Sequence, residues 1–382
     1  MRILHTSDWH LGRSFHREGM LAHQAAYVDH LLDVVATERA DLVVVSGDVY
    51  DRALPHVDAV RLADETLARL AASRAKVVLT SGNHDSAQRL GFSSRLIDAA
   101  GVFIRTDAAG VGTPVGLADE DGPVAVYGLP FLDPLALAEP WRLPVRSHQA
   151  ALSVALDRVR RDLATRPSGT RSVVLAHAFV GGGVPSDSER DICVGGVDLV
   201  PAAVFDGVDY VALGHLHRPQ TLTPRLRYSG SPLAYSFGEA GQQKQAWLVE
   251  LDRCGLAEVR AVPLPTPRPL TVLTGTLEEL LADPDHAAAE GNFVSARLTD
   301  AVRPADPMRR LQSRFRHCVH LEWTGSTAIT AGRSYQELLR GRSDMEVVGE
   351  FVSRVRTVPA TEAERSLLGQ ALAAAARAEA AE

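Results

Sequence analysis

Five short strings of acidic, histidine and asparagine residues carry the chemistry of this 382-residue chain. Their side chains offer carboxylate, imidazole and amide donors without sulfur, a set suited to manganese, iron or zinc rather than calcium. Two divalent ions held side by side can bind a phosphodiester, supply a nucleophile and stabilise charge on the five-coordinate phosphorus. The strings therefore predict a two-metal phosphoesterase site. Its candidate ligands are Asp8, His10, Asp48, Asn83, His177, His215 and His217.

The elements that must position these ligands are visible as apolar runs. Each string directly follows a run typical of a short buried strand, and open α/β sheets place their functional residues at the ends of strands. We therefore expect the five strings to converge at one sheet edge. The strand runs are 3–4, 42–45, 77–79, 173–175 and 211–213, and amphipathic helices are expected over about 20–36, 57–72 and 149–164.

One carboxylate must bridge two ions, and Asp48 is the natural bridge because it follows Gly47 at the end of an apolar strand. Asp8 and His10 are two residues apart and project on the same side of an extended segment. The expected division follows from these placements. One ion would take Asp8, His10 and His217, and the other would take Asn83, His177 and His215.

His84 and Asp51 are predicted to act beside the metals rather than as ligands. His84 follows Asn83 on a tight loop, so it should face the substrate, orient the phosphate and protonate the leaving oxygen. Asp51 lies three residues after the bridge and is expected to accept the other ring N–H of His84. One such string alone would be weak evidence for a metal site, since Gly-Asn also forms turns. The prediction depends on the occurrence of all five strings together.

Composition narrows the class of protein. The net charge of −7 and the sequence pI near 6.1 exclude a polycation, so any affinity for DNA must come from local patches, metals or a partner. Cys193, Cys254 and Cys318 lack the spacing of a disulfide framework or a thiolate metal site. No apolar run approaches membrane-spanning length and no leader pattern precedes the first string, so we expect a cytoplasmic protein without a membrane.

The chain is expected to divide at a proline-rich segment, because proline at every second position forbids a helix and favours an extended spacer. A layered α/β domain precedes it and a small α/β module follows. Two amphipathic helices with capping boxes, Ser343 with Glu346 and Thr361 with Glu364, end the sequence, and they either fold back or dock on a partner. The predicted parts are 1–262, the linker 263–269, the module 270–340 and the helices 343–382.

The strings resemble the calcineurin-like metallophosphoesterases, whose pattern is Asp-x-His, Gly-Asp, Gly-Asn-His-Asp/Glu, a lone His and Gly-His-x-His. The resemblance covers residues 1 to about 250. Protein phosphatases of the superfamily differ, since Ala53 follows Arg52 here and Asp85 closes the third string. The spelling is more similar to the SbcD-type nucleases, in His-Thr-Ser-Asp-Trp-His-Leu-Gly (5–12), Ser-Gly-Asp-Val-Tyr-Asp (46–51), Ala-Leu-Gly-His-Leu-His-Arg (212–218) and Tyr-Ser-Gly-Ser-Pro (228–232).

This resemblance implies a four-layer sandwich of two mixed sheets flanked by helices, with a capping domain at 270–340 and C-terminal helices. It implies manganese as the metal, the ligands named above, His84 as the catalytic histidine and Asp51 as its supporting carboxylate. It further implies a DNA-repair nuclease that degrades double-stranded ends from the 3′ side and cuts single strands and hairpins. Such a protein would be a nucleoid-associated homodimer bound through residues 343–382 to an SbcC-type ATPase, as a hetero-tetramer.

Two other functions use the same features. A phosphodiesterase for small nucleotides needs the same metals and would be favoured by a C-terminal lid over a closed pocket. A catalytically silent scaffold that tethers DNA ends is opposed by the intact ligand set, including His84.

Overall fold

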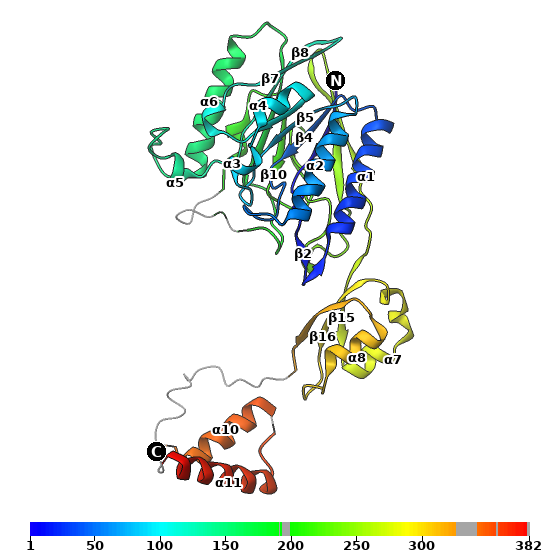
Figure 1. Ribbon diagram of the computed structural model, residues 1–382, viewed down its shortest axis with the longest axis vertical. Helices are drawn as coiled ribbons and strands as arrows, with labels where there is room; N and C mark the ends of the chain where they lie inside the picture. Colours follow the sequence, from blue (N-terminus) through cyan, green and yellow to red (C-terminus); the bar gives the residue numbers. More distant parts are fainter. Residues whose placement is uncertain (191, 193–198, 326–341, 357, 380–382) are drawn as a thin grey trace. The chain divides into compact units, whose positions relative to one another are not determined.

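The computed structural model describes residues 1–190, 192, 199–325, 342–356 and 358–379. It divides the chain into two units, Met1–Pro269 and Leu270–Glu382 (Figure 1). Each unit has its own hydrophobic core. The five ligand strings all lie in the first unit.

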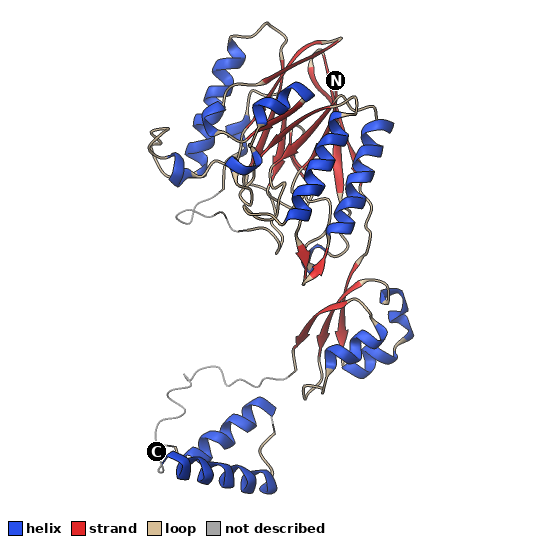
Figure 2. Ribbon diagram, in the orientation of Figure 1, coloured by secondary structure: helices blue, strands red, loops and turns tan. Residues whose placement is uncertain are grey.

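The first unit is built on two six-stranded mixed sheets (Figure 2). The first sheet has the order β14-β13-β1-β4-β5-β6, in which β1, β4, β5 and β6 are parallel and β13 and β14 are antiparallel to their neighbours. Its strands are β1 (Arg2–Thr6), β4 (Leu42–Ser46), β5 (Lys76–Thr80), β6 (Val102–Arg105), β13 (Gln245–Asp252) and β14 (Gly255–Pro263).

The second sheet has the order β11-β12-β10-β9-β8-β7, with parallel pairing from β12 to β8 and antiparallel strands at both edges. Its strands are β7 (Val115–Asp119), β8 (Gly122–Gly128), β9 (Arg171–His177), β10 (Tyr210–Gly214), β11 (Gln220–Thr223) and β12 (Leu226–Tyr228). A hairpin of β2 (Ser14–Phe15) and β3 (Glu18–Gly19) stands apart from both sheets.

Side-chain alternation along the strands produces four layers, because successive residues of a strand point to opposite faces. Val44 and Leu175 belong to a core between the two sheets. Their neighbours Val43 and Val174 belong to two outer cores, one closed by α1 and α2 and the other by α6. The central strands are buried on both faces, which explains their apolar runs.

The helices of the first unit cover the outer faces of the sheets. The two long helices on the first sheet bury apolar stripes that include Leu31 and Leu62, and α6 buries Leu156 on the second. These helices are α1 (Leu21–Thr37), α2 (Val57–Ala71) and α6 (His148–Ala164); shorter ones are α3 (Ala87–Leu90), α4 (Ser94–Ile97) and α5 (Pro134–Leu137).

The second unit contains a three-stranded parallel sheet, β15-β16-β17, and its core is filled by residues of the strands and of α7 and α8. A capping box in which Thr276 and Glu279 exchange hydrogen bonds begins α7. The elements are β15 (Leu270–Gly275), α7 (Leu277–Ala282), β16 (Phe293–Leu298), α8 (Pro307–Arg314), β17 (Cys318–Trp323), α10 (Asp344–Arg356) and α11 (Glu362–Glu379).

The expected four-layer class is confirmed, whereas the sequence indicated only part of the sheet edges. The edge strands β7 and β11 were not expected, because Gly116 and Ala118 in β7 and threonines in β11 interrupt their apolar pattern. Cys254 is exposed and Cys318 is buried, both as free thiols, and Cys193 and the end of the predicted module, 326–340, lie outside the described residues. Among the described helices, none has both the length and the apolar character needed to cross a bilayer.

Candidate metal centre

The five strings meet where strands of both sheets end. Asp8 and His10 follow β1, Asp48 follows β4 and Asn83 follows β5, all in the first sheet. His177 is the last residue of β9 in the second sheet, and His215 and His217 follow β10 there. The structure thus brings together all seven side chains that the sequence predicted as ligands; six of them are buried and Asn83 is half-buried. Their exposures are 4 % or less for Asp8, His10, Asp48, His177, His215 and His217.

Unusual backbone geometry holds these loops in place. Asp8, His10, Asp48 and His215 have φ values of 53°, 45°, 50° and 102°, in the left-handed region that residues other than glycine seldom adopt. Such strain is characteristic of functional sites, where the surrounding structure enforces it. The enforcement is visible here, since the N–H groups of Asp8 and His10 donate to the carbonyls of Gly47 and Asp48 at 3.1 and 3.0 Å.

The glycine of the third string permits the close approach of two loops. A Cβ atom on Gly82 would lie 2.1 Å from Oδ1 of Asp48, far inside van der Waals contact. The same Asp48 oxygen accepts the main-chain N–H of His84 at 2.9 Å. Gly82 is therefore required by the packing of the third string on the second, and not only by a turn.

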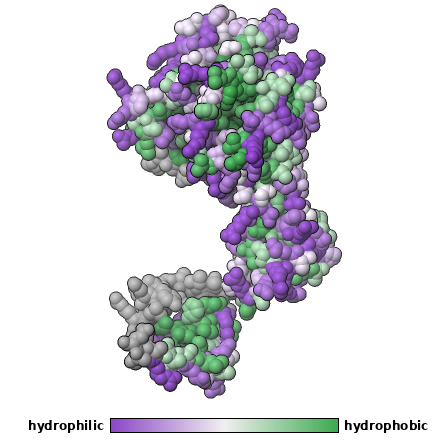
Figure 3. All heavy atoms as spheres, in the orientation of Figure 1, coloured by the Kyte–Doolittle hydropathy of each residue, from purple (hydrophilic) through white to green (hydrophobic). Residues whose placement is uncertain are grey.

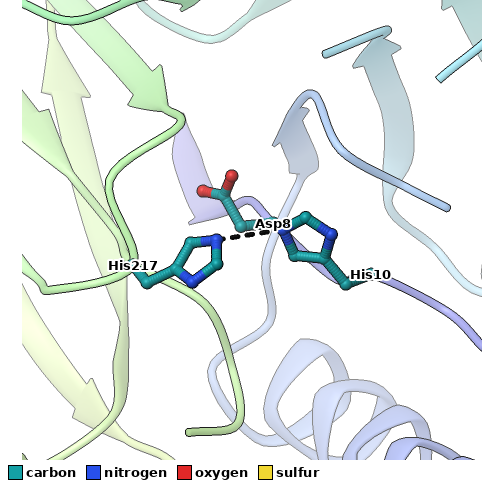
Figure 4. A group of neighbouring side chains, drawn as sticks. All are labelled: Asp8, His10 and His217. Carbon is teal, nitrogen blue, oxygen red and sulfur yellow. Dashed lines mark hydrogen bonds between the residues drawn. The ribbon is translucent and has the colours of Figure 1, made fainter. Parts of the chain in front are cut away.

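Asp8, His10 and His217 form one group whose potential ligand atoms all lie within 4.8 Å of one another (Figure 4). Nε2 of His10 is 3.0 Å from Nε2 of His217, and Figure 4 shows these two nitrogens turned toward each other beside the carboxylate of Asp8. Two imidazole nitrogens and a carboxylate oxygen at this spacing suit a divalent cation of the manganese, iron or zinc type.

A second group surrounds Asp48. Its Oδ2 atom is 3.6 Å from Nε2 of His10 and 3.5 Å from Nε2 of His177. Oδ1 of Asn83 lies 2.9 Å from Nε2 of His177 and 3.3 Å from Nδ1 of His215. Asp48 therefore lies between the ligand atoms expected for the two ions, which is the position that a bridging carboxylate must occupy.

Burial keeps three of the histidines neutral, so their lone pairs are available to a cation. Removal from water lowers the pKa of His215 to about 3 and holds the pKa values of His10 and His217 well below the ordinary value. A neutral imidazole is the form that binds a metal. These three side chains need lose no proton when a cation arrives at neutral pH.

The remaining charges are poorly balanced without a cation. Burial raises the pKa of Asp8 to about 7, and the nearby charge of Asp48 acts in the same direction. Burial alone would lower the pKa of His177, but the charge of Asp48 and its hydrogen bond outweigh it and raise that pKa to about 9. Two buried carboxylates thus draw positive charge into the site. Divalent cations would supply that charge, so the donor set and its electrostatics both fit the two metals that the fold implies.

His84 lies beside both groups, and its support differs from the sequence-based expectation. The ring of His84 is 4.7 Å from the ring of His10, and its Nδ1 is 2.8 Å from the main-chain oxygen of Asp51, not from the expected carboxylate. The carboxylate of Asp51 instead lies 3.6 Å from Nδ1 of His10 and 3.7 Å from Nε of Arg13. The difference arises because the main-chain carbonyl of Asp51, and not its side chain, faces the ring of His84.

Sequence reasoning missed a buried chain of polar groups behind His217. Oγ of Ser188 is 2.5 Å from Nδ1 of His217 and donates to Oε1 of Glu239 at 2.7 Å. Glu239 forms a buried ion pair with Lys244, whose Nζ also donates to the main-chain oxygen of His217 at 2.9 Å. Because the Ser188 proton goes to Glu239, the hydroxyl accepts from Nδ1–H of His217, which leaves Nε2 for the cation.

Asp85, the last residue of the third string, has a structural role. Its carboxylate accepts the main-chain N–H groups of Val49, Tyr50 and Gly82 at 3.1, 2.8 and 2.9 Å. It thereby joins the loop after β4 to the loop after β5. No spacing pattern in the sequence indicates Ser188, Glu239 or Lys244 as supports of His217.

Comparison with known families agrees with this geometry. The profile of the family described as calcineurin-like phosphoesterase matches residues 1–219, which contain every candidate ligand. The chain belongs to the calcineurin-like phosphoesterases. A second profile, SbcD_C, described as type 5 capsule protein repressor C-terminal domain, matches residues 266–356. The two matches in this order support an SbcD-type nuclease within the metallophosphoesterase superfamily, as the resemblance implied.

Several solved structures are similar to this chain at low sequence identity. They include a novel archaeal phosphodiesterase (14% identity, TM-score 0.32), TT1561 of Thermus thermophilus (12%, 0.40) and a dimetal phosphatase from Danio rerio (15%, 0.41). Each alignment covers 69% of this chain and 99 to 100% of the solved one.

Proposed function

We propose that this calcineurin-like phosphoesterase is a manganese-dependent DNA nuclease of DNA repair, a 3′-to-5′ exonuclease on double strands and an endonuclease on single strands and hairpins. The observation that carries the proposal is the convergence of seven oxygen and nitrogen donors in the first unit of a chain whose residues 266–356 match the SbcD_C profile. The family membership itself supports a metal-dependent phosphoesterase.

The residues that would hold two metal ions are those predicted from the sequence. Asp8, His10 and His217 would hold one ion, Asn83, His177 and His215 the other, and Asp48 both. When bound, the ions would supply charge stabilisation to the phosphodiester and the means to generate a nucleophile at neutral pH.

The other proposed roles belong to side chains of this protein. Nδ1 of His84 is engaged by the main-chain oxygen of Asp51, which fixes the ring and leaves Nε2 to face the substrate. There it would orient the phosphate and pass a proton to the leaving oxygen. Asp51 itself would act on His10 and Arg13 through its carboxylate, and on His84 through its backbone.

The proposed partners are DNA, a second copy of the chain and an SbcC-type ATPase. Leu54, Val57 and Val60 expose 71, 65 and 43% of their surface near the start of α2, which supports a self-contact there. Phe351 and Val355 of α10 expose 54 and 58%, and Figure 3 shows hydrophobic side chains gathered on the α10–α11 pair. Helices with such faces suit a docking segment for an ATPase partner. Residues 270–340 would form the capping domain that positions DNA.

The decisive experiment incubates the chain with Mn²⁺ and 3′- or 5′-labelled duplex, hairpin and single-stranded DNA, with and without the ATPase. Shortening from the 3′ end and opening of the hairpin are expected. The absence of cleavage in both conditions would refute the proposal. Turnover of cyclic nucleotides without DNA cleavage would select the small-nucleotide phosphodiesterase, and binding of fewer than two ions at saturating Mn²⁺ would select the silent scaffold.

A further inference from the structure

A large groove, one wall of which is Phe131, is not used by the chemistry described above. It has a volume of about 1240 Å³ and is lined by α3, α4, the loop after β6 and the segment from β8 to α5. Figure 3 shows hydrophobic side chains on the face of the first unit that carries α3 and α4. Apolar lining residues include Leu96, Ile104, Phe131 and Leu137.

Phe131 connects this groove to the candidate ligands. Its main-chain N–H donates to the oxygen of Ser81 at 2.7 Å, which ties it to the start of the loop that carries Asn83. Its half-buried ring stands edge-on to the ring of His177, with the centroids 6.4 Å apart. The ring of His148 lies 5.5 Å away on another side. Phe131 is therefore both a wall of the groove and a neighbour of a candidate metal ligand.

The polar groups of the groove are mostly engaged within the protein. Arg105 is held by both carboxylate oxygens of Asp98 at 2.9 Å. The carboxylates of Asp107 and Asp133 accept main-chain N–H groups in the first turns of the helices that they cap. The groove therefore offers apolar side chains with hydroxyl and amide groups and the exposed Arg95 at its margins, rather than a cluster of charges. Such a surface suits a nucleobase better than a phosphate group.

We propose that this groove receives the unpaired base next to the phosphodiester at the metal centre, and that Phe131 is the ring on which the base stacks. The inference rests on the proposed function and names its substrate class. A base can stack on Phe131 only after leaving its own duplex, so the site acts on single strands, frayed ends and hairpin loops. Phe131 thus sets specificity without taking part in bond cleavage.

The test compares Phe131→Leu, which keeps an apolar side chain without the ring, with Phe131→Tyr, which keeps the ring. The substrates are single-stranded oligothymidylate and an abasic oligonucleotide of equal length, both with Mn²⁺. For oligothymidylate, KM should rise roughly 10- to 100-fold in Phe131→Leu while kcat changes little, and Phe131→Tyr should resemble wild type. For the abasic strand, wild type and Phe131→Leu should have equal KM values, because this substrate has no base to stack on residue 131.

Phe92→Leu is the matched control, because Phe92 is 79% exposed and does not line the groove. Its kinetics should equal those of wild type, and Mn²⁺ stoichiometry from calorimetry should be two in all variants. An unchanged KM for oligothymidylate in Phe131→Leu, or an equal loss on the abasic strand, would overturn the inference. A lower sedimentation mass of Phe131→Leu would also overturn it, by showing that the groove is a contact between copies.

A binding measurement separates failure of this inference from failure of the proposed function. A 2-aminopurine base in a single strand loses fluorescence when it stacks on an aromatic ring, and no cleavage is required. Quenching by wild type but not by Phe131→Leu would support the groove even if the chain cleaved no DNA. Equal quenching by both proteins would reject the groove even if the nuclease activity were present.

Discussion

Replacement of Ser188 by alanine is expected to weaken one of the two metal sites and leave the other intact. Ser188 is not itself a candidate metal ligand. Its hydroxyl accepts from Nδ1–H of His217 and donates to Glu239, so it fixes the proton of His217 on the nitrogen that faces away from the cation. Without Ser188 the ring can place its proton on Nε2 and donate to Nε2 of His10, 3.0 Å away. A cation must then reverse this choice before it binds.

The size of the effect follows from what the bound state would lose. With a cation on Nε2, the Nδ1–H of His217 would remain buried without its acceptor, which costs about 1–3 kcal/mol. Loss of a hydrogen bond that orients a metal-binding histidine typically lowers affinity about 10- to 100-fold, or about 1.4–2.8 kcal/mol. The two ranges agree. We expect the affinity of one Mn²⁺ to fall by that factor and kcat/KM to fall with it at limiting metal.

Titration calorimetry of the metal-free protein with Mn²⁺ measures this directly, because the two sites should separate into two phases in the variant. Ser236→Ala is the control, since the hydroxyl of Ser236 contacts the same Glu239 oxygen at 3.3 Å. That variant should bind both ions as wild type does. The reasoning is wrong if Ser188→Ala also binds both ions with wild-type affinity, or if it weakens both sites equally.

Three further outcomes are expected. His84→Ala should keep both ions in calorimetry but lose hydrolysis, since His84 moves a proton; loss of metal would contradict its role. Asp51→Asn should reduce activity much less than His84→Ala in parallel assays, because the contact to His84 comes from the Asp51 main chain. Burial would raise the pKa of Asp119, but Arg171 hydrogen bonds hold it below the ordinary range, so its contribution to stability is present above about pH 4 and lost as pH falls. Urea unfolding of Asp119→Asn should therefore show a smaller loss of stability from pH 5 to pH 3 than wild type; identical pH profiles would exclude that role.

The fold and the convergence of the seven candidate side chains were largely predictable, because both depend on short local sequence patterns. Each central strand contains an apolar run of two to four residues, and each ligand ends such a strand or lies within a few residues of its end. Strand pairing then determines where the ligands meet. The edge strands could not be predicted in this way, since β7 and β11 alternate exposed residues with few apolar ones.

The residues that hold the candidate ligands through hydrogen bonds were not predictable, because these bonds join segments that are distant in the sequence. Ser188 and Lys244 lie 29 and 27 positions from His217, and neither stands in a recognisable spacing. The misassigned Asp51 carboxylate has a similar cause. Sequence proximity indicated that residue 51 lies near His84, but not whether its side chain or its carbonyl would face the ring.

The position of the ligands on two separate sheets links assembly of the protein to its metal supply. His10 and His217 are 207 positions apart and follow strands of different sheets. Their side chains are therefore far apart when the chain is unfolded. Cations that bind only the native arrangement of these donors would link the two sheets to each other. At a free concentration 100 times the dissociation constant, each contributes about 2.7 kcal/mol against unfolding. Chelation should therefore lower the melting temperature as well as abolish turnover, and a cell short of the metal would hold a more fragile enzyme.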